Sequence, residues 1–146
     1  MLEKEFVPYE QSLALKELGF DEPCLAHLIG FGDGTIENGK YVINYQQVFY
    51  PNDFIESDDK AEELGLHPFG ICGVPLYQQA FRWFREKCKI HLVINLTIIG
   101  TWYFELYDLN DKRNAEIKTN QNEFKTYEEA ELACLIKLIE IANEQQ

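Results

Sequence analysis

Two cysteine–histidine pairs are the residues whose types and spacing best fit metal or thiol chemistry in this chain. Cys24 and His27 stand three positions apart, and His67 and Cys72 stand five apart. Together these four residues could supply the two thiolates and two imidazoles of a Cys2His2 zinc site. The spacing of His67 and Cys72 is looser than that of a C-x2-C pair. Residues three apart on an extended strand, such as Cys24 and His27, point to opposite faces. We therefore expect no metal and no other cofactor.

Cys72 is also the candidate nucleophile, because the glycines on either side of it in GICGV favour an exposed loop. The candidate base is His67 or His91. The sequence shows no recognisable motif around Cys72 and no residue placed to orient either histidine, so we do not predict an enzyme. We interpret the other thiols as small buried apolar side chains: Cys24, Cys88 and Cys134.

A basic cluster stands out in a chain that is otherwise acidic. Arg82, Arg85 and Lys89 are spaced three and four apart, so they share one face of a predicted helix. This face is a candidate docking patch for an acidic partner. The alternative, which we favour, is a solvated face whose charges form ion pairs within the chain.

A tyrosine-rich strand provides the second candidate contact surface. In WYFELYDL (102–109), Tyr103, Glu105 and Tyr107 alternate with apolar residues and share one face of the predicted strand. Exposed tyrosines are well suited to protein or ligand contact, since each has an apolar ring and a polar hydroxyl. Alternatively, the N-terminal hairpin covers this face.

The elements that position these residues begin with a short helix after Pro8, which Gly19 and Phe20 end as a Schellman motif. The segments 24–31 and 40–50 predict two strands of a hairpin with a long connection. Between 57 and 74 the sequence is acidic and then rich in Gly and Pro, which favours a loop or linker.

The C-terminal half predicts a regular order of elements. A helix of three to four turns begins at Pro75, and strands follow over 90–99 and 102–109, joined by a compact turn at Gly100-Thr101. A short third strand lies at AEIKT (115–119). Thr126 and Glu129 form the capping box of a last helix that extends to about Asn143.

This last helix is apolar over more than half of its circumference, so it needs a covering layer on two sides. We favour a position between the two halves over an oligomer interface. The sequence thus predicts one integrated domain, 1–146, of the α+β class, in which helices pack on one face of antiparallel sheet. Its parts are a helix and hairpin (1–56), the acidic linker (57–74) and an α-β-β-β-α module (75–146).

Net charge narrows the range of partners. The chain has 13 basic and 25 acidic side chains, a formal net charge of −12. Residues 1–75 account for −10, residues 76–91 for +3 and residues 92–146 for −5. A field of this sign repels phosphate backbones and acidic membranes. The first residues, MLEKEFVPYEQ, have no basic and apolar leader pattern, so we expect a cytoplasmic protein.

The order of elements in the C-terminal half resembles the double-stranded-RNA-binding domain. In that family, lysines at the start of the second helix grip duplex phosphates. This chain has Thr126, Tyr127, Glu128 and Glu129 there. The resemblance therefore implies the topology of that family, whereas the carboxylates argue against its RNA-binding activity.

Three sequence blocks are similar to small hypothetical proteins of bacteriophages and other mobile elements of gut anaerobes. The blocks are LALKELGFDEPC (13–24), LYQQAFRWFREK (76–87) and TYEEAELACLIKLIE (126–140). No activity is attached to that group, so the similarity implies an accessory protein of a mobile element and carries over no site.

Three functional hypotheses follow. The first is a non-enzymatic accessory protein that acts through contact with a protein partner, as a monomer or a homodimer. The second is an acidic mimic of nucleic acid that inhibits a host protein, with carboxylates spaced like phosphates. The third is a small thiol- or zinc-dependent enzyme centred on Cys72 and His67.

Overall fold

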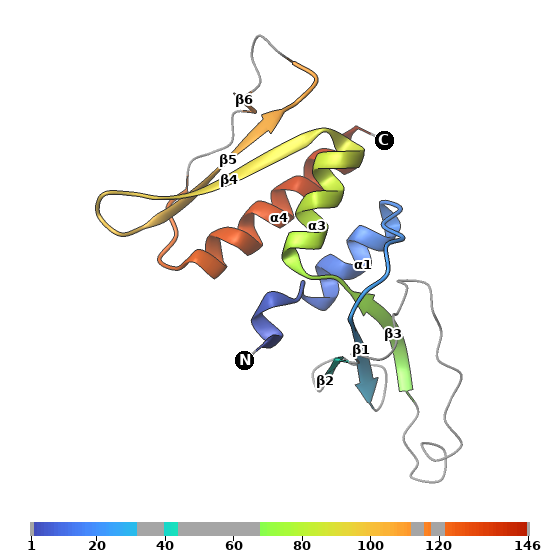
Figure 1. Cartoon of the computed structure of the whole chain (residues 1–146). Coiled ribbons are helices and arrows are strands. Elements are labelled where there is room, and N and C mark those ends of the chain that lie inside the picture. The colour runs from blue at the N-terminus through green and yellow to red at the C-terminus, as the bar shows by residue number, and fades with distance from the viewer. Residues whose placement is uncertain (1, 32–39, 44–67, 112–115, 118–121, 146) are drawn as a thin grey trace. The chain divides into compact units, whose positions relative to one another are not determined.

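The structure is a computed structural model that describes residues 2–31, 40–43, 68–111, 116–117 and 122–145. Helices and antiparallel sheets both occur in it, so the chain belongs to the α+β class, as the sequence predicts. It divides into two compact units, Met1–Leu76 and Tyr77–Gln146 (Figure 1). The single integrated domain stays a prediction.

The first unit contains an antiparallel sheet with the strand order β2-β1-β3. Strands β1 (Ala26–Phe31) and β2 (Lys40–Ile43) pair with Ala26 opposite Ile43, which confirms the predicted hairpin. The rest of the predicted second strand, residues 44–50, lies outside the described residues.

Strand β3 (Pro68–Val74) occupies a segment that the sequence predicts to be loop. It pairs with β1, placing Cys72 opposite Leu28 and Gly73 opposite His27. The neighbouring strand provides hydrogen-bond partners for this glycine-rich backbone, so pairing outweighs its weak intrinsic strand propensity. Cys72 is therefore part of a strand and not of a loop. The remainder of the predicted linker, 57–67, lies outside the described residues.

Helix α1 (Tyr9–Glu17) follows a short 3-10 helix, η1 (Leu2–Glu5), and ends as predicted. Gly19 has a φ of +94°, the left-handed conformation that glycine adopts without steric cost. The Gly19 N–H donates to the Lys16 carbonyl, and the Phe20 N–H donates to the Leu15 carbonyl at 2.9 Å. These two bonds form the Schellman motif.

The N-terminal segment is bound to the end of β3 in this unit. Phe6 forms an antiparallel bridge with Leu76, and the Val7 N–H donates to the Pro75 carbonyl at 2.9 Å. Phe6 packs with Ala26 and Val74 in a buried cluster. The cluster joins residues from both ends of the unit and so stabilises its fold.

The second unit begins with helix α3 (Tyr77–Trp83), which continues as a π-helical turn, η3 (Phe84–Cys88). Lys89 follows with a φ of 59°, and its N–H donates to the Phe84 carbonyl. A left-handed residue other than glycine costs about 1–2 kcal/mol. The prediction that Arg82, Arg85 and Lys89 share one helix face is therefore wrong for Lys89, because the helix ends before it and its last turn is wider than an α-helical one.

Three antiparallel strands follow in the order β4-β5-β6: β4 (Ile90–Leu96), β5 (Trp102–Asp108) and β6 (Glu116–Ile117). Ile90 pairs with Asp108 at one end of the β4–β5 hairpin, and Leu96 pairs with Trp102 at the other. This register confirms the alternation predicted for both strands, except at Ile98.

The β4–β5 turn differs from the predicted two-residue Gly100-Thr101 turn. The Thr97 N–H donates to the Thr101 carbonyl, and the Gly100 N–H donates to the Thr97 carbonyl. The turn residues are therefore Ile98, Ile99 and Gly100. Gly100 has a φ of +86°, the position that a type I turn followed by a bulge requires. Ile98 thus leaves the strand and joins the turn.

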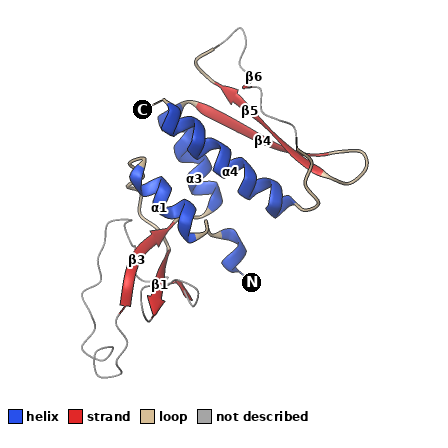
Figure 2. Ribbon diagram, turned by 180° about the vertical axis from the view of Figure 1, so that it is seen from behind, coloured by secondary structure: helices blue, strands red, loops and turns tan. Residues whose placement is uncertain are grey.

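Helix α4 (Tyr127–Glu144) covers one face of this sheet (Figure 2). Its capping box is formed as predicted: the Glu129 N–H donates to Thr126 Oγ1 at 3.2 Å, and the Thr126 N–H donates to the Glu129 carboxylate. The side chains buried along the helix are Ala130, Cys134, Leu135, Leu138, Ile139 and Ala142. None of the helices in the described ranges has the length and apolar character needed to cross a bilayer.

Candidate partner-binding surface

The sheet of the second unit has two chemically different faces. Phe104 and Leu106 of β5 are buried, at 8% and 0% exposure, and Phe104 lines a pocket together with residues of α4. The residues that alternate with them are half-buried. We call this second face the tyrosine face; it consists of Tyr103, Glu105 and Tyr107 of β5 with His91 and Asn95 of β4.

Glu105 is the centre of a hydrogen-bond network on the tyrosine face. Its Oε2 atom accepts a bond from Asn95 Nδ2 at 3.0 Å and another from the Tyr107 hydroxyl at 3.1 Å. Both donors come from the same face, one from the neighbouring strand and one from two positions along β5. The network holds a charged carboxylate between two polar side chains and so restricts their rotamers.

The hydrogen bond to Glu105 raises the pKa of Tyr107 above its ordinary value of 10.0. Partial burial and the negative charges of Glu105 and Glu116 act in the same direction. Tyr107 is therefore a protonated donor across the neutral range. This excludes it as a base at neutral pH and fits a contact role, in which its hydroxyl keeps a fixed orientation.

Strand pairing adds two titratable residues around Tyr107. His91 lies opposite it on β4, and Glu116 lies opposite it on β6. Across an antiparallel pair, such neighbours lie close enough to interact. The edge of the tyrosine face beside β6 is thus acidic, and its β4 side carries an imidazole.

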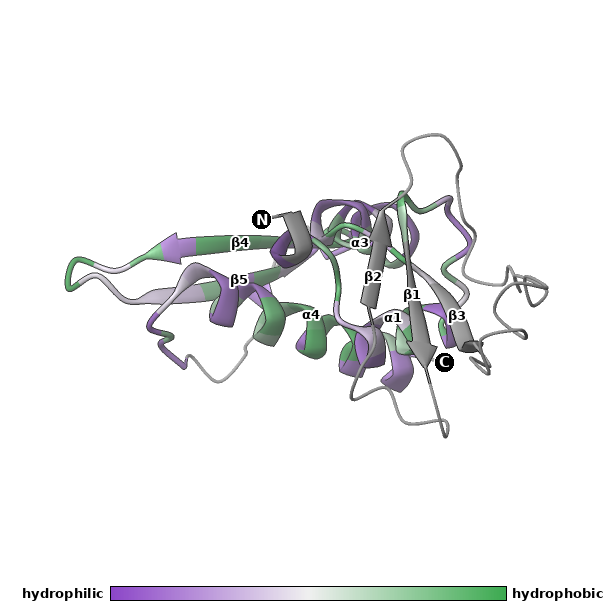
Figure 3. Cartoon of the chain, turned by 90° about the horizontal axis from the view of Figure 1, so that it is seen from below, coloured by the Kyte–Doolittle hydropathy of each residue, from purple (hydrophilic) through white to green (hydrophobic). Residues whose placement is uncertain are grey.

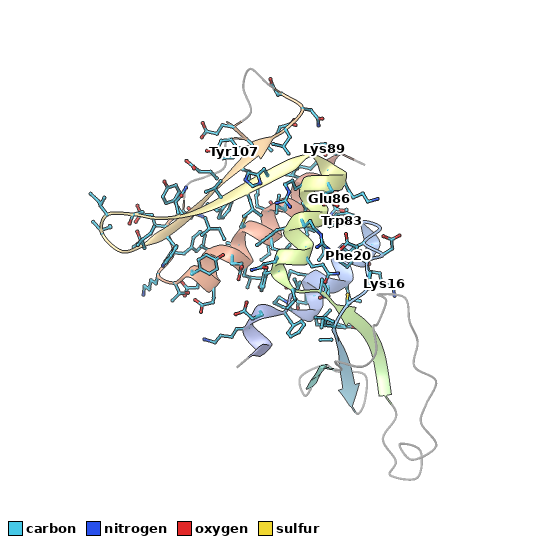
Figure 4. All side chains as sticks on the ribbon, viewed as in Figure 1. Lys16, Phe20, Trp83, Glu86, Lys89 and Tyr107 are labelled. Carbon is cyan, nitrogen blue, oxygen red and sulfur yellow. The ribbon has the colours of Figure 1, made fainter. Side chains whose placement is uncertain are left out.

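The basic residues of the predicted patch are all exposed: Arg82 on α3, Arg85 on η3, and Lys89 between η3 and β4. Lys89 and Tyr107 lie at the same end of the β4–β5 hairpin, as their labels in Figure 4 show. The Lys89 carbonyl accepts a 2.7 Å bond from the Leu109 N–H, which fixes this end. Backbone pairing therefore places Lys89 beside the end of β5, two residues beyond Tyr107.

The thiols whose surroundings are described, those of Cys24, Cys88 and Cys134, are shielded. Cys24 and Cys134 are buried, as predicted, and Cys88 is half-buried. Burial raises the pKa of the Cys88 thiol, and burial together with the nearby Glu131 raises that of Cys134. Both remain protonated at neutral pH, so neither has the thiolate character that a nucleophile needs.

Of the four candidate zinc ligands, only Cys24 has a side chain whose surroundings are described, and it is buried. His67 is not among the described residues, and for His27 and Cys72 only the backbone position in β1 and β3 is described. Among the side chains that are described, no three His, Cys, Asp or Glu residues gather into a metal-binding group.

Two features of the second unit are not among the functional residues that the sequence predicts. Asn95 joins the Glu105 network and lies opposite Tyr103. The alternation of residues along β4 is the sequence feature that could have identified it. Ile98 and Ile99 form an exposed turn. The sequence feature that could have identified this turn is the pair of β-branched residues directly before Gly100, where turns normally carry polar residues.

No protein-family model matches the chain, and comparisons with curated proteins and with solved structures found no match either. The tyrosine face is therefore interpreted from its own geometry.

Proposed function

We propose that this chain is a non-enzymatic accessory protein that binds a protein partner through the tyrosine face. The observation that carries the proposal is the Asn95–Glu105–Tyr107 network on a half-buried sheet face. Tyrosine is favoured in protein interfaces because it supplies a large contact area with few rotatable bonds. The network fixes these side chains in advance, which lowers the entropy lost on binding.

The chemistry of the face supports contact more than catalysis. Both donors to Glu105 Oε2 belong to the same face, and the Tyr107 hydroxyl remains protonated at neutral pH. A general acid or base would need a pKa near the working pH. A face with one carboxylate, two phenols and an imidazole instead suits a polar partner segment that exchanges hydrogen bonds with it.

The second unit has the element order α3, β4, β5, β6, α4, which supports a likeness to the double-stranded-RNA-binding domain as a proposal at the level of topology. Glu128 and Glu129 are exposed at the start of α4, and Glu129 is part of the capping box. Negative charge at this helix terminus is favourable for the helix and unfavourable for a phosphate. We therefore include a protein partner, and not nucleic acid, in the proposal.

We do not extend the proposal to an acidic mimic of nucleic acid. Several carboxylates of the second unit bind groups of the same unit: Glu105 binds Asn95, Glu123 binds Thr101, and Glu140 binds Lys137. Carboxylates engaged in this way are less available to imitate a row of phosphates. A cytoplasmic location and an origin in a phage or related element remain part of the proposal, supported by the sequence alone.

Affinity capture from a host lysate tests this function when it is done with matched baits. The wild-type chain is compared with the double variant Tyr103→Ser/Tyr107→Ser, which removes both rings from the tyrosine face. The control is Leu109→Asn, which removes an apolar side chain that is 47% exposed just beyond β5. We expect a defined partner with the wild type and the control, and its loss with the double variant.

A partner that the double variant retains would contradict the proposed surface, and the absence of any specific partner would contradict the proposed function. Circular dichroism of each bait shows whether its fold is intact. A second variant, Glu105→Gln, keeps the shape of the face and removes its charge. It is expected to weaken capture without abolishing it, because the Gln oxygen still accepts a hydrogen bond.

A further inference from the structure

Glu105 is a half-buried carboxylate whose charge is balanced by no cation among the described residues. Its Oε2 atom accepts both of its hydrogen bonds, from Asn95 and from Tyr107, and both donors are neutral. By contrast, Glu140 of α4 forms an ion pair with Lys137 at 2.8 Å. A carboxylate that loses part of its hydration through burial is stabilised by a counter-ion. The position of Glu105 therefore suits a cation that a partner supplies.

Two oxygen atoms on the tyrosine face are open to hydrogen-bond donors. Within the described ranges, neither Oε1 of Glu105 nor the Tyr103 hydroxyl takes part in a hydrogen bond. The two residues share one face of β5 and are two positions apart, so their Cα atoms are separated by roughly 7 Å. A single ligand group with several donors can therefore bind both oxygens.

Asn95 keeps the other carboxylate oxygen occupied. It is the second-last residue of β4, the end at which Figure 3 shows a hydrophilic band in a largely hydrophobic strand. Its Nδ2 atom donates to Glu105 Oε2 at 3.0 Å. With Oε2 held by Asn95 and Tyr107, the carboxylate is fixed in orientation before a partner arrives, and this lowers the entropy lost on binding.

Aromatic rings flank Glu105 on both sides along β5. Tyr103 and Tyr107 are half-buried, so part of each side chain remains accessible to solvent. The Tyr107 hydroxyl reaches Glu105 Oε2 at 3.1 Å, which places this side chain beside the carboxylate. Cations are attracted to the face of a tyrosine ring within about 6 Å of its centre. The tyrosine face thus combines negative charge, open acceptors and aromatic surface around one position.

Charge beyond this position acts in the same direction. Glu116 lies opposite Tyr107 on β6 and is exposed. The whole chain has a formal net charge of −12. A field of this sign attracts cationic groups and speeds their encounter with the protein, whereas it repels a second copy of the same chain. A partner of complementary charge is therefore basic.

We propose that the tyrosine face binds an arginine side chain of its protein partner, with the guanidinium on Glu105 Oε1 and against the neighbouring tyrosine rings. The inference rests on the proposed function and names the chemistry of the partner. Arginine fits better than lysine because its planar guanidinium has five N–H donors, which can bind Oε1 and the Tyr103 hydroxyl together. It also stacks on aromatic rings and is less strongly hydrated than an ammonium group.

Three short peptides test the assignment. They are blocked at both ends, contain no other charged residue, and differ only in a central arginine, lysine or citrulline, the neutral isostere of arginine. NMR titration of the isotope-labelled chain follows the side-chain amide of Asn95 and the backbone amides of β5. We expect the arginine peptide to bind about threefold more tightly than the lysine peptide, and the citrulline peptide to show no binding. Added salt should weaken binding of the arginine peptide.

Variants assign the contact to individual side chains. Glu105→Gln should lower the affinity for the arginine peptide by about fivefold, the effect of one ion pair near the surface. The matched control, Glu140→Gln, removes the same charge from α4, on the other side of the sheet, and should leave this affinity nearly unchanged. Tyr103→Phe keeps the ring and removes the hydroxyl, so it should reduce the preference for arginine over lysine. The dispersion of each NMR spectrum shows whether the fold is intact.

Four outcomes overturn the inference. They are an arginine peptide that does not bind, a citrulline peptide that binds as tightly, a lysine peptide that binds as tightly, and a loss of affinity in Glu140→Gln as large as that in Glu105→Gln. The last of these would show that the net charge of the chain attracts the peptide without a defined site.

Addition of the same peptides to the lysate capture separates this inference from the proposed function. We expect the arginine peptide to compete with the captured partner and the citrulline peptide to have no effect. Capture that requires Tyr103 and Tyr107 but resists the arginine peptide would overturn the inference and leave the proposed surface in place. Specific binding of the arginine peptide without any captured protein would retain the cation site and contradict the proposed function.

Discussion

The two faces of the β4–β5–β6 sheet carry different kinds of side chain on the same backbone. On the face toward α4, Leu106 is fully buried, and Phe104 stacks against Phe124. On the other face, Tyr107 and Glu105 are half-buried and joined by a hydrogen bond. Neighbouring residues of a strand point to opposite sides of the sheet. The single strand β5 therefore contributes side chains to both faces.

The proposed function assigns fold stability to the buried face and partner contact to the tyrosine face. The buried face gains free energy from removing apolar surface from water, whereas the tyrosine face is held by hydrogen bonds that contribute modestly to folding. Substitutions on the first face should therefore act on the fold, and substitutions on the second should act on binding.

The largest expected effect tests this separation directly. Leu106→Ala removes a side chain of 0% exposure and should lower the free energy of unfolding by about 2–5 kcal/mol. Val93 of β4 is half-buried opposite Glu105, on the tyrosine face. Its truncation, Val93→Ala, should cost about 1 kcal/mol or less. Urea denaturation of both variants measures the difference. Equal losses would show that the two faces contribute alike to stability.

A smaller effect is expected at the start of α4, the helix that covers the buried face. Thr126→Ala removes the hydroxyl that accepts from the Glu129 N–H, and should cost about 1 kcal/mol. Thr126→Ser keeps the hydroxyl and is the control. Thermal unfolding compares the two, and alkylation of buried Cys134 reports loosening of the helix. A Thr126→Ala variant with the same thermal stability as the wild type would mean that the capping box does not stabilise α4.

The smallest effect concerns the pH dependence of the tyrosine face. The raised pKa of Tyr107 has its largest cause in the Glu105 bond, so Glu105→Gln should lower that pKa toward 10.0. Because the folded pKa is raised, the contribution of this bond is complete below the unfolded pKa and is lost as pH rises through the folded value. Ultraviolet titration measures this shift when the curve of the matching Tyr107→Phe variant is subtracted, because the chain has 8 tyrosines. No shift would contradict the network.

Local signals were sufficient to predict several elements. Gly19 and Phe20 identify the Schellman end of α1, and Thr126 with Glu129 identifies the start of α4. Such motifs act within one helical turn, so a short stretch of sequence contains their whole cause. The alternation of 102–109 likewise predicts the tyrosine face from the period of a strand.

Other features depend on contacts that are distant in sequence or on strain. Strand β3 forms because β1 lies beside it, although its own Pro and Gly residues favour a loop. The π-helical turn ends at Lys89, which adopts a left-handed backbone conformation. The sequence has no Gly or Asn at this position that would predict such a conformation. The sequence predicts a strand at Ile98 because an apolar β-branched residue is uncommon in a turn. Asn95 enters the Glu105 network only through strand pairing.

Hydroxyl-radical labelling, read out residue by residue by mass spectrometry, tests most directly whether the tyrosine face is a contact surface. The labelling does not depend on the ionisation of tyrosine. Tyr77 (7% exposed) and Tyr127 (40% exposed) are internal standards for buried and exposed rings. In the purified protein, Tyr103 and Tyr107 should react at rates closer to Tyr127 than to Tyr77, and addition of a host lysate should protect them selectively. Protection equal to that of Tyr77 in the purified protein, or labelling that the lysate leaves unchanged, would contradict the claim.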